Sequence, residues 1–275
     1  MSDPRAALDA IGQLPDSEID IAGAALQFAR VDASDADWEA AQAHLSEIAR
    51  AAAALAGTLE DSDLATRAIA LSGLLGGRFG YKGDPANYDD LANANLIRVT
   101  ERRRGLPVAL GVIWLHAARA AGWEGHGVDF PAHFLVALEG EKTQTLLDVF
   151  NGGTPLSVRD LRALLRRVEG DKAELRPGLL RPMSARRVLL RLQNNIMTRR
   201  LQANEFESAL ACAEDMLRIA PDHAELWRQT GTLNQQLDRV GAALGCYERF
   251  LVLVPDGGVA TEVRGIVGSL RARLN

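Results

Sequence analysis

The sequence predicts an α+β protein that is mostly helical, with three consecutive parts. These are a helical N-terminal region, a core with a small antiparallel sheet, and an α-solenoid of two repeats followed by a capping helix. A repeat of 34 residues occupies the C-terminal third, alanine-rich amphipathic runs fill the N-terminal region, and short β-favouring runs follow an apolar helix between them. With 275 residues, 47% of them hydrophobic, the chain is long enough to bury a substantial core.

Equal spacing of identical residues defines the C-terminal repeat. The interval of 34 positions separates three pairs: Pro221 and Pro255, Ala209 and Ala243, and Cys212 and Cys246. Thirty-four residues is the period of the tetratricopeptide repeat, a helix–turn–helix unit, and the second copy carries the residue types typical of it: Trp227, Gly231, Ala243, Tyr247 and Phe250. We therefore expect two repeats, the first opening with the less typical helix Val188–Arg200, and a capping helix over Val259–Leu274.

The residues before the core are expected to be helical. Hydrophobic residues recur at helical spacing in four segments: Ala6–Ile11, Ile19–Phe28, Trp38–Ala56 and Leu64–Phe79. Asp35 and Asp61 are expected as N-caps of two of these helices. Prolines and glycine at positions 177, 178 and 182 mark the passage into the repeats. We expect one domain over residues 1–180, with its core at about 80–155, and a repeat domain over residues 181–275.

The middle of the chain changes from a polar loop to an apolar helix and then to strands. Residues 80–95 are rich in glycine and asparagine, which is typical of an ordered functional loop. Val108–Ala121 is apolar almost all round, so we expect a buried central helix with Gly122 as its C-cap. A small antiparallel sheet on this helix is expected from Gly127–Phe130, Phe134–Leu138 and Thr145–Phe150, followed by a helix over Ser157–Val168.

Composition and charge exclude several classes of function. The formal net charge of −5 provides no general attraction for polyphosphate, and the short arginine clusters at 102–104, 166–167 and 199–200 are typical of solvated helix surface. No apolar stretch approaches the roughly 20 residues of a membrane span, and the first residues lack the pattern of a leader peptide. We therefore expect a cytoplasmic protein without nucleic-acid or membrane binding. Only three lysines stand among 31 basic residues, which suggests GC-rich bacterial coding.

A histidine and an aspartate follow the central helix on successive strands. His133 opens one predicted strand and Asp148 lies on the next, which is the layout of a papain- or transglutaminase-like site. In such a site the imidazole activates a thiol, and the carboxylate fixes the tautomer of the imidazole. A hairpin turn near Glu141 would bring His133 and Asp148 opposite one another.

Four runs in this order carry a resemblance to a known family: Gly80–Gly83 with Asn93, Arg103–Leu110, Val128–Val136 and Asp148–Gly153. Together they resemble the SirB-type family of transglutaminase-like proteins, over roughly residues 60–275. The resemblance implies a helical N-terminal region, a transglutaminase-like core and C-terminal tetratricopeptide repeats. In active members of the wider superfamily, a nucleophilic cysteine stands in a Gly-x-Cys setting at the start of the central helix, and here that setting reads Gly105-Leu106-Pro107.

Pro107 has neither thiol nor hydroxyl, so the resemblance implies a degenerate nucleophile position without covalent catalysis of the usual type. Three interpretations of His133 and Asp148 remain open. They could form a structural hydrogen bond, whose loss would leave a buried polar group unsatisfied at a cost of about 1–3 kcal/mol. They could instead catalyse without a cysteine. The third interpretation is a pocket that binds a peptide or small anion and includes further polar side chains, namely Asn93, Arg103 or Arg104, and Asn151.

The favoured function is a non-catalytic scaffold for protein interaction or regulation, a pseudoenzyme whose repeat groove holds a protein or peptide. The alternative is a peptidase or amidase-like hydrolase, in which His133 acts as base on water and Asp148 orients it. We expect no cofactor. We also expect no metal site, because His116, His126 and His133 lack the paired spacing of metal ligands. Cys212 and Cys246 are interpreted as core residues of the repeats.

Overall fold

The computed structural model describes residues 3–274, which divide into two units by their internal contacts. Residues 15–192 form the core unit. Residues 3–14 and 193–274 form the repeat unit. The division therefore falls at residues 192 and 193, inside the helix α8 (Ala185–Gln202), whereas the boundary expected from the sequence lies before that helix.

The core unit contains an antiparallel sheet of five strands in the order β6-β5-β4-β3-β7. Its strands are β3 (Gly125–Phe130), β4 (His133–Glu139), β5 (Gln144–Asp148), β6 (Thr154–Leu156) and β7 (Pro182–Met183). The three expected strands, β3 to β5, are confirmed. The two edge strands were not expected because each has at most three residues and contains a proline, which a sheet tolerates at its edge.

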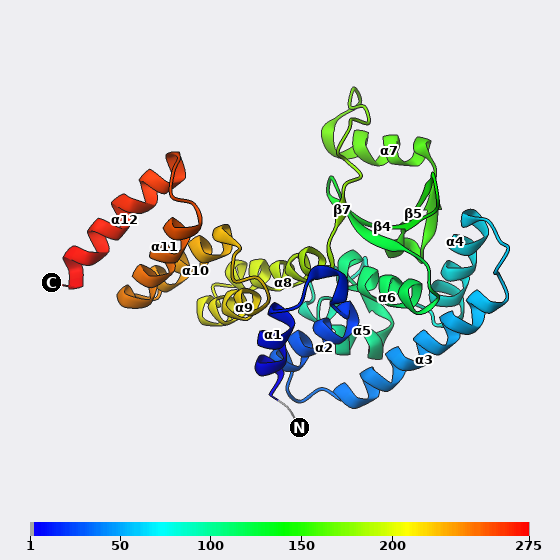
Figure 1. Ribbon diagram of the computed structural model, residues 1–275, viewed down its shortest axis with the longest axis horizontal. Helices are drawn as coiled ribbons and strands as arrows, with labels where there is room; N and C mark the ends of the chain where they lie inside the picture. The colour runs from blue at the N-terminus through cyan, green and yellow to red at the C-terminus, as the bar shows by residue number, and fades with distance from the viewer. Residues whose placement is uncertain (1–2, 275) are drawn as a thin grey trace. The chain divides into compact units, whose positions relative to one another are not determined.

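The sheet is covered on both faces, as Figure 1 shows for the helices α6 (Pro107–Ala120) and α7 (Val158–Glu169). Leu161 and Leu165 of α7 join one core cluster with sheet residues Val128, Phe130, Leu135, Ala137 and Leu146. On the other face, α6 approaches β4 so closely that a Cβ on Gly111 would lie 2.2 Å from Cε1 of Phe134. A glycine is therefore required at this point of α6.

The expected central helix is confirmed as α6, which is buried along most of its length. Helices α2 (Ile21–Asp32), α3 (Trp38–Gly57), α4 (Leu64–Ser72) and α5 (Leu96–Arg102) contact α6. The Trp114 side chain at its centre is fully buried. Gly122 follows the helix with φ +69°, a left-handed conformation that glycine adopts without a Cβ penalty.

The expected N-caps Asp35 and Asp61 are wrong by two residues in each case. Asp37 Oδ1 accepts a hydrogen bond from Ala40 N at 2.9 Å at the start of α3, and Asp63 Oδ1 accepts from Thr66 N at 2.7 Å at the start of α4. An N-cap must directly precede the first helical residue, because its side chain reaches the amide three positions on. The last part of the expected helix Leu64–Phe79 is a separate π-helical turn, Gly73–Arg78.

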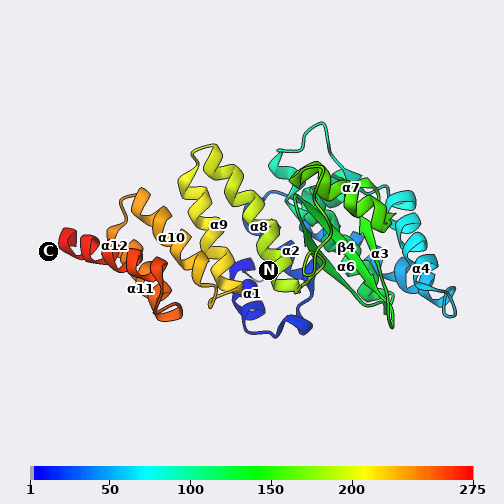
Figure 2. The ribbon, with the colours of Figure 1, turned by 90° about the horizontal axis from the view of Figure 1, so that it is seen from above.

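The repeat unit confirms the two tetratricopeptide repeats and the helix that follows them. After α8 come α9 (Phe206–Ile219), α10 (Ala224–Gln236), α11 (Val240–Leu253) and α12 (Gly258–Leu274), which lie side by side in chain order in Figure 2. Asn204 and Asp238 are 34 residues apart, and both have left-handed φ values, 60° and 57°, in the turns between paired helices. The repeat therefore extends to the backbone conformation.

An additional helix, α1 (Pro4–Gly12), packs on α9 within the repeat unit. The Leu8 side chain is fully buried, and ion pairs flank it: Arg5 Nε to Asp215 Oδ1 and Arg218 Nη1 to Asp9 Oδ2, both at 2.9 Å. The sequence placed this segment with the N-terminal helical region. The partners of Arg5 and Asp9 lie more than 200 positions away, so local pattern could not identify them.

Gly111→Ala should destabilise the core unit, although alanine gains about 1 kcal/mol over glycine in a helix interior. The new Cβ would overlap the Phe134 ring, and overpacking of a core costs about 1–3 kcal/mol. Urea unfolding followed by circular dichroism measures the effect. Gly57→Ala at the end of α3 is the matched control, because nothing lies within 4 Å of its added Cβ. A Gly111→Ala protein as stable as this control would contradict the close packing.

Candidate functional site

The start of α6 is where the resemblance places the nucleophile. Leu106 is the extended N-cap residue, and Pro107 occupies the first helical position, where a missing N–H costs nothing. The Leu106 amide donates to the Asn93 carbonyl at 2.8 Å, which ties this start to the loop before α5. A short parallel ladder pairs Lys82 with Arg104 and Gly83 with Gly105 just before it. The proline thus fits the backbone but offers no reactive atom.

His133 is the first residue of β4, and its half-buried side chain makes no hydrogen bond within residues 3–274. Its backbone carbonyl accepts a hydrogen bond from Arg191 Nη2 of α8 at 3.3 Å. The Arg191 guanidinium also pairs with Asp129 and lies 5.6 Å from the centre of the Phe134 ring. Burial lowers the pKa of Arg191. Sequence reasoning did not select Arg191, because its position in a repeat helix gave no sign of a contact with β4.

Asp148 uses both carboxylate oxygens within its own turn. Oδ1 accepts from the amides of Phe150 (3.1 Å) and Asn151 (3.3 Å), and Oδ2 accepts from Asn151 Nδ2 at 2.6 Å. Asp148 is therefore the N-cap of a 3₁₀ turn, Val149–Asn151, and it is only 9% exposed. In the described part of the chain, no hydrogen bond joins Asp148 to His133.

The expected register of His133 and Asp148 is wrong by two residues. The observed ladder pairs Val136 with Leu147, and one further step along it places Asp148 opposite Leu135. The turn covers residues 140–143, with Gly140 N donating to Thr143 O at 2.8 Å. Its centre therefore lies one position later than the expected register required. His133 remains on the same face of the sheet as Leu135, two positions further along β4.

The two candidate arginines make local contacts. Arg103 Nη1 donates to the Tyr81 hydroxyl at 2.9 Å and also to the Thr100 carbonyl, and Arg104 Nη1 donates to the carbonyls of Gly80 and Arg103. Burial of Tyr81 raises its pKa to about 12, although Arg103 opposes that shift. These contacts hold residues 80–83 beside the start of α6, and they explain the conformation of this loop without a bound molecule.

The two candidate asparagines differ in their exposure. Asn93 is fully buried, and its Nδ2 donates to the Asn87 carbonyl at 2.7 Å. Its Oδ1 has no hydrogen-bond partner among the residues that the structure describes. Asn151 is exposed and closes the turn with Asp148. Phe150, which follows Asp148 by two positions, packs so closely on Gly83 that a Cβ there would lie 2.3 Å from Cε2 of the ring.

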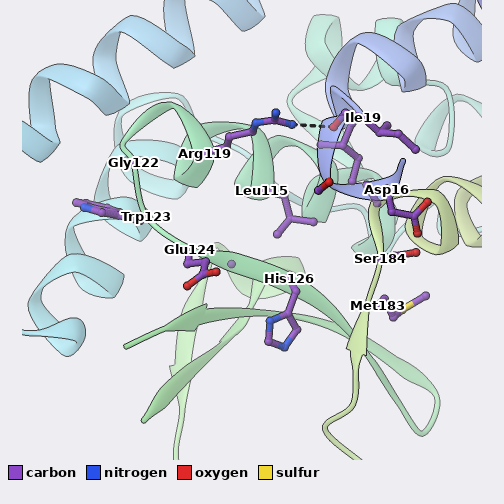
Figure 3. Close-up of a pocket in the computed structure, with 14 residues that line it drawn as sticks. Asp16, Ile19, Leu115, Arg119, Gly122, Trp123, Glu124, His126, Met183 and Ser184 are labelled. Carbon is purple, nitrogen blue, oxygen red and sulfur yellow. Dashed lines mark hydrogen bonds between the residues drawn. The ribbon is translucent and has the colours of Figure 1, made fainter. Parts of the chain in front are cut away.

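A separate cavity of about 680 Å³ lies at the other end of α6, and Figure 3 shows its lining. Its apolar lining comes from Ile19, Ile21, Leu115 and Met183. Its polar part includes Arg119, whose Nη1 donates to the Ile19 carbonyl at 2.7 Å. The cavity contains none of the site residues expected from the sequence. It therefore does not unite the start of α6, His133 and Asp148.

His126 lines this cavity from β3 and carries an incompletely paired ring. Its Nδ1 lies 3.1 Å from Glu139 Oε1, and its buried Nε2 has no hydrogen-bond partner in residues 3–274. Burial lowers the pKa of His126, and the charges of Glu139 and Glu124 only partly oppose this shift. Within the same residues, no group of three or more His, Cys, Asp or Glu side chains could hold a metal ion. No described helix has the length and hydropathy needed to cross a membrane.

Comparison with known proteins gives matches to both units. Residues 39–194 match the model of the transglutaminase-like superfamily, and residues 196–267 match a tetratricopeptide-repeat model. A UPF0162 protein of Xylella fastidiosa is 34% identical over 191 residues, which cover 68% of each chain. A UPF0162 protein of Vibrio cholerae is 29% identical over 193 residues, or 70% of this chain and 71% of that protein.

A more distant similarity joins the chain to a larger protein. F-box only protein 21 of Mus musculus is 26% identical over 126 residues, which are 43% of this chain and 19% of that protein. No solved structure matches the chain.

Asp148→Ala should destabilise the protein by about 1–3 kcal/mol, because it removes the acceptor for two backbone amides and one side-chain amide. His133→Ala should have a smaller effect, because the imidazole makes no hydrogen bond in the described residues. In a double-mutant cycle measured by urea unfolding, the coupling between the two changes should stay within about 0.5 kcal/mol. A coupling well above that value would restore the structural His–Asp hydrogen bond.

The stability of the core unit should depend on pH through His126. Its pKa in the folded state lies below the ordinary value of 6.5, so the unfolded state binds more protons between the two values. The stabilisation is therefore present above pH 6.5 and is lost as the pH falls through that window. Urea midpoints measured over this range should fall less steeply for His126→Gln than for the wild type. Equal slopes for the two proteins would contradict this.

Proposed function

Because this chain belongs to the transglutaminase-like superfamily and to the UPF0162 family, we propose that it is a non-catalytic scaffold for protein interaction or regulation. In this proposal the core unit is a pseudoenzyme of the SirB type, and the repeat unit holds a protein or peptide partner. The proposal places the protein in the bacterial cytoplasm. The observation that carries it is the use of Asp148 as the cap of its own turn, next to a helix that starts at Pro107.

The chemistry of the core unit supports this proposal. Covalent catalysis requires a nucleophile that an adjacent base can activate, and the first turn of α6 has Pro107, Val108 and Ala109 in that place. Activation of water by His133 would require an orienting partner for its imidazole. Both oxygens of Asp148 are engaged by Phe150 and Asn151, so the carboxylate is committed elsewhere.

The repeat unit offers a polar surface for a peptide. Four side chains at helical spacing on α10 form what we call the α10 stripe: Glu225, Arg228, Thr232 and Gln235. Arg228 makes a bidentate contact with Glu225, at 2.8 and 2.6 Å. The Tyr247 hydroxyl of α11 lies 3.1 Å from Thr232 Oγ1 and donates to Gln235 Oε1 at 3.1 Å. These groups present both donors and acceptors, which suits an extended or helical peptide.

A partner captured by the tagged full-length protein should be lost from the double variant Arg228→Ala/Thr232→Ala, because both changes remove hydrogen-bonding groups of the α10 stripe. Quantitative pull-down followed by mass spectrometry measures the loss. The control is Gln236→Ala, which changes an exposed residue of the same helix outside the stripe. Retention of every partner by the double variant would refute binding at the stripe.

The catalytic alternative is tested on the same preparations with a panel of amide and peptide substrates. We expect wild type and His133→Ala to show equal background hydrolysis, because no nucleophile stands at position 107. Hydrolysis by the wild type that disappears in His133→Ala would overturn the non-catalytic proposal. It would favour a peptidase or amidase-like hydrolase with a water nucleophile.

A further inference from the structure

The 34-residue correspondence continues past the second repeat into α12. Gly265 follows Gly231 by 265 − 231 = 34 positions, and Gly268 follows Asn234 by the same interval. Gly231 is the glycine at which the paired helices of a tetratricopeptide repeat approach one another. By position, α12 therefore corresponds to the first helix of a third repeat rather than to a cap of unrelated sequence.

In the second repeat this face of the first helix is covered by the second helix, α11. A Cβ on Gly231 would lie 3.0 Å from the Tyr247 ring, and Asn234 Nδ2 lies 3.9 Å from Cys246 Sγ. Thr230 and Asn234 are accordingly only 1% and 2% exposed. The charge of Glu214 on α9 acts on Cys246, so α11 lies close to α9 as well as to α10.

On α12 the equivalent face is open. A Cβ added at Gly265 or Gly268 would meet no atom within 4 Å. A groove of about 440 Å³ runs between α11 and α12, and its lining includes Glu248, Leu251, Val267 and Gly268. Each of these residues follows by 34 positions a residue of the α9–α10 pair: Glu214, Leu217, Leu233 and Asn234. The groove therefore repeats the position that α11 occupies one repeat earlier.

We propose that the groove between α11 and α12 binds an amphipathic helix of a partner protein, in the position of the second helix of a third repeat. Val252, which is 69% exposed at the groove, supplies apolar surface that such a helix would bury. The bound helix needs a small residue followed four positions later by a large one, as Ala243 and Tyr247 are arranged on α11. This pattern allows close approach to α12 at its glycines.

The charges around the groove select an acidic helix. Arg264 and Arg271 line it at positions where the second repeat has the neutral residues Thr230 and Leu237. The Arg271 side chain is 62% exposed and lies 2.7 Å from Glu248 Oε1, a pairing that a partner carboxylate could extend. A second copy of α12 would instead bring arginines against arginines. An acidic helix from another protein is therefore the better occupant.

The probe is a fluorescent synthetic peptide with the sequence of residues 240–254, in which Gly241 and Gly245 are replaced by glutamate. Both positions are exposed on α11 and have no atom within 4 Å of an added Cβ, so the glutamates leave the packing face intact. Anisotropy titration with the full-length protein should give saturable binding, with Kd on the order of 10–100 μM because a short peptide pays for helix formation. Absence of saturable binding would overturn the proposal.

Gly265→Leu/Gly268→Leu should weaken peptide binding by at least about tenfold, because the added side chains fill the position of the bound helix. Arg264→Glu/Arg271→Glu should weaken it about fivefold while changing only exposed residues, so its folding is not at risk. Gly241→Leu, at an open position of α11 outside the groove lining, is the control and should bind as the wild type does. Equal affinity for the wild type and both double variants would contradict the assignment.

Two further measurements separate this proposal from other outcomes. Arg228→Ala/Thr232→Ala should bind the peptide normally, because the α10 stripe lies outside the groove lining. Normal binding supports the groove independently of the proposed function, and loss of binding would move the peptide to the stripe. Sedimentation of the wild type alone tests the remaining occupant. A dimer that Gly265→Leu/Gly268→Leu dissociates would show that a second copy fills the groove, against the proposal.

Discussion

The burial of α6 is the constraint on which the core unit depends. This helix is apolar almost all round, so it has to be covered by the sheet on one side and by α2, α3 and α5 on the others. Close packing against β4 requires the glycine at position 111, and a regular first turn favours the proline at position 107. The place where related enzymes hold a nucleophile thus serves helix initiation. Strands β3 to β5 then carry His133 and Asp148 on the covered sheet.

Local hydrogen bonding decides what the polar residues near the start of α6 can do. Asp148 satisfies the amides of the turn that follows it, and that turn holds Phe150 against Gly83. Arg103 and Arg104 satisfy carbonyls of their own neighbourhood. A charged group engaged in this way is costly to redirect, because each buried acceptor that it leaves would be unsatisfied. The loops around the start of α6 are consequently well supported, while the elements of a catalytic pair stay apart.

The repeat unit follows a different rule, in which each helix covers the one before it. Tyr247 on Gly231 is one instance, and the left-handed turns at Asn204 and Asp238 keep the same geometry 34 residues apart. Translational repetition makes an uncovered face recognisable, because the preceding repeat shows what would cover it. Gly265 and Gly268 define such a face on α12. The outer surface of α9 is different, since α1 covers it through Leu8 and its flanking ion pairs.

The sequence by itself determined the fold class, the repeats and their period, the buried central helix, the three main strands and the absence of a nucleophile at position 107. These features depend on local periodicity and residue type, which a single chain displays directly. Only the tertiary structure decided the register of His133 and Asp148, the edge strands β6 and β7, the docking of α1 on α9 and the contact of Arg191 with β4. Each of these depends on where a turn is centred or on partners distant in sequence, and a shift of one residue in a turn is invisible to hydrophobic pattern.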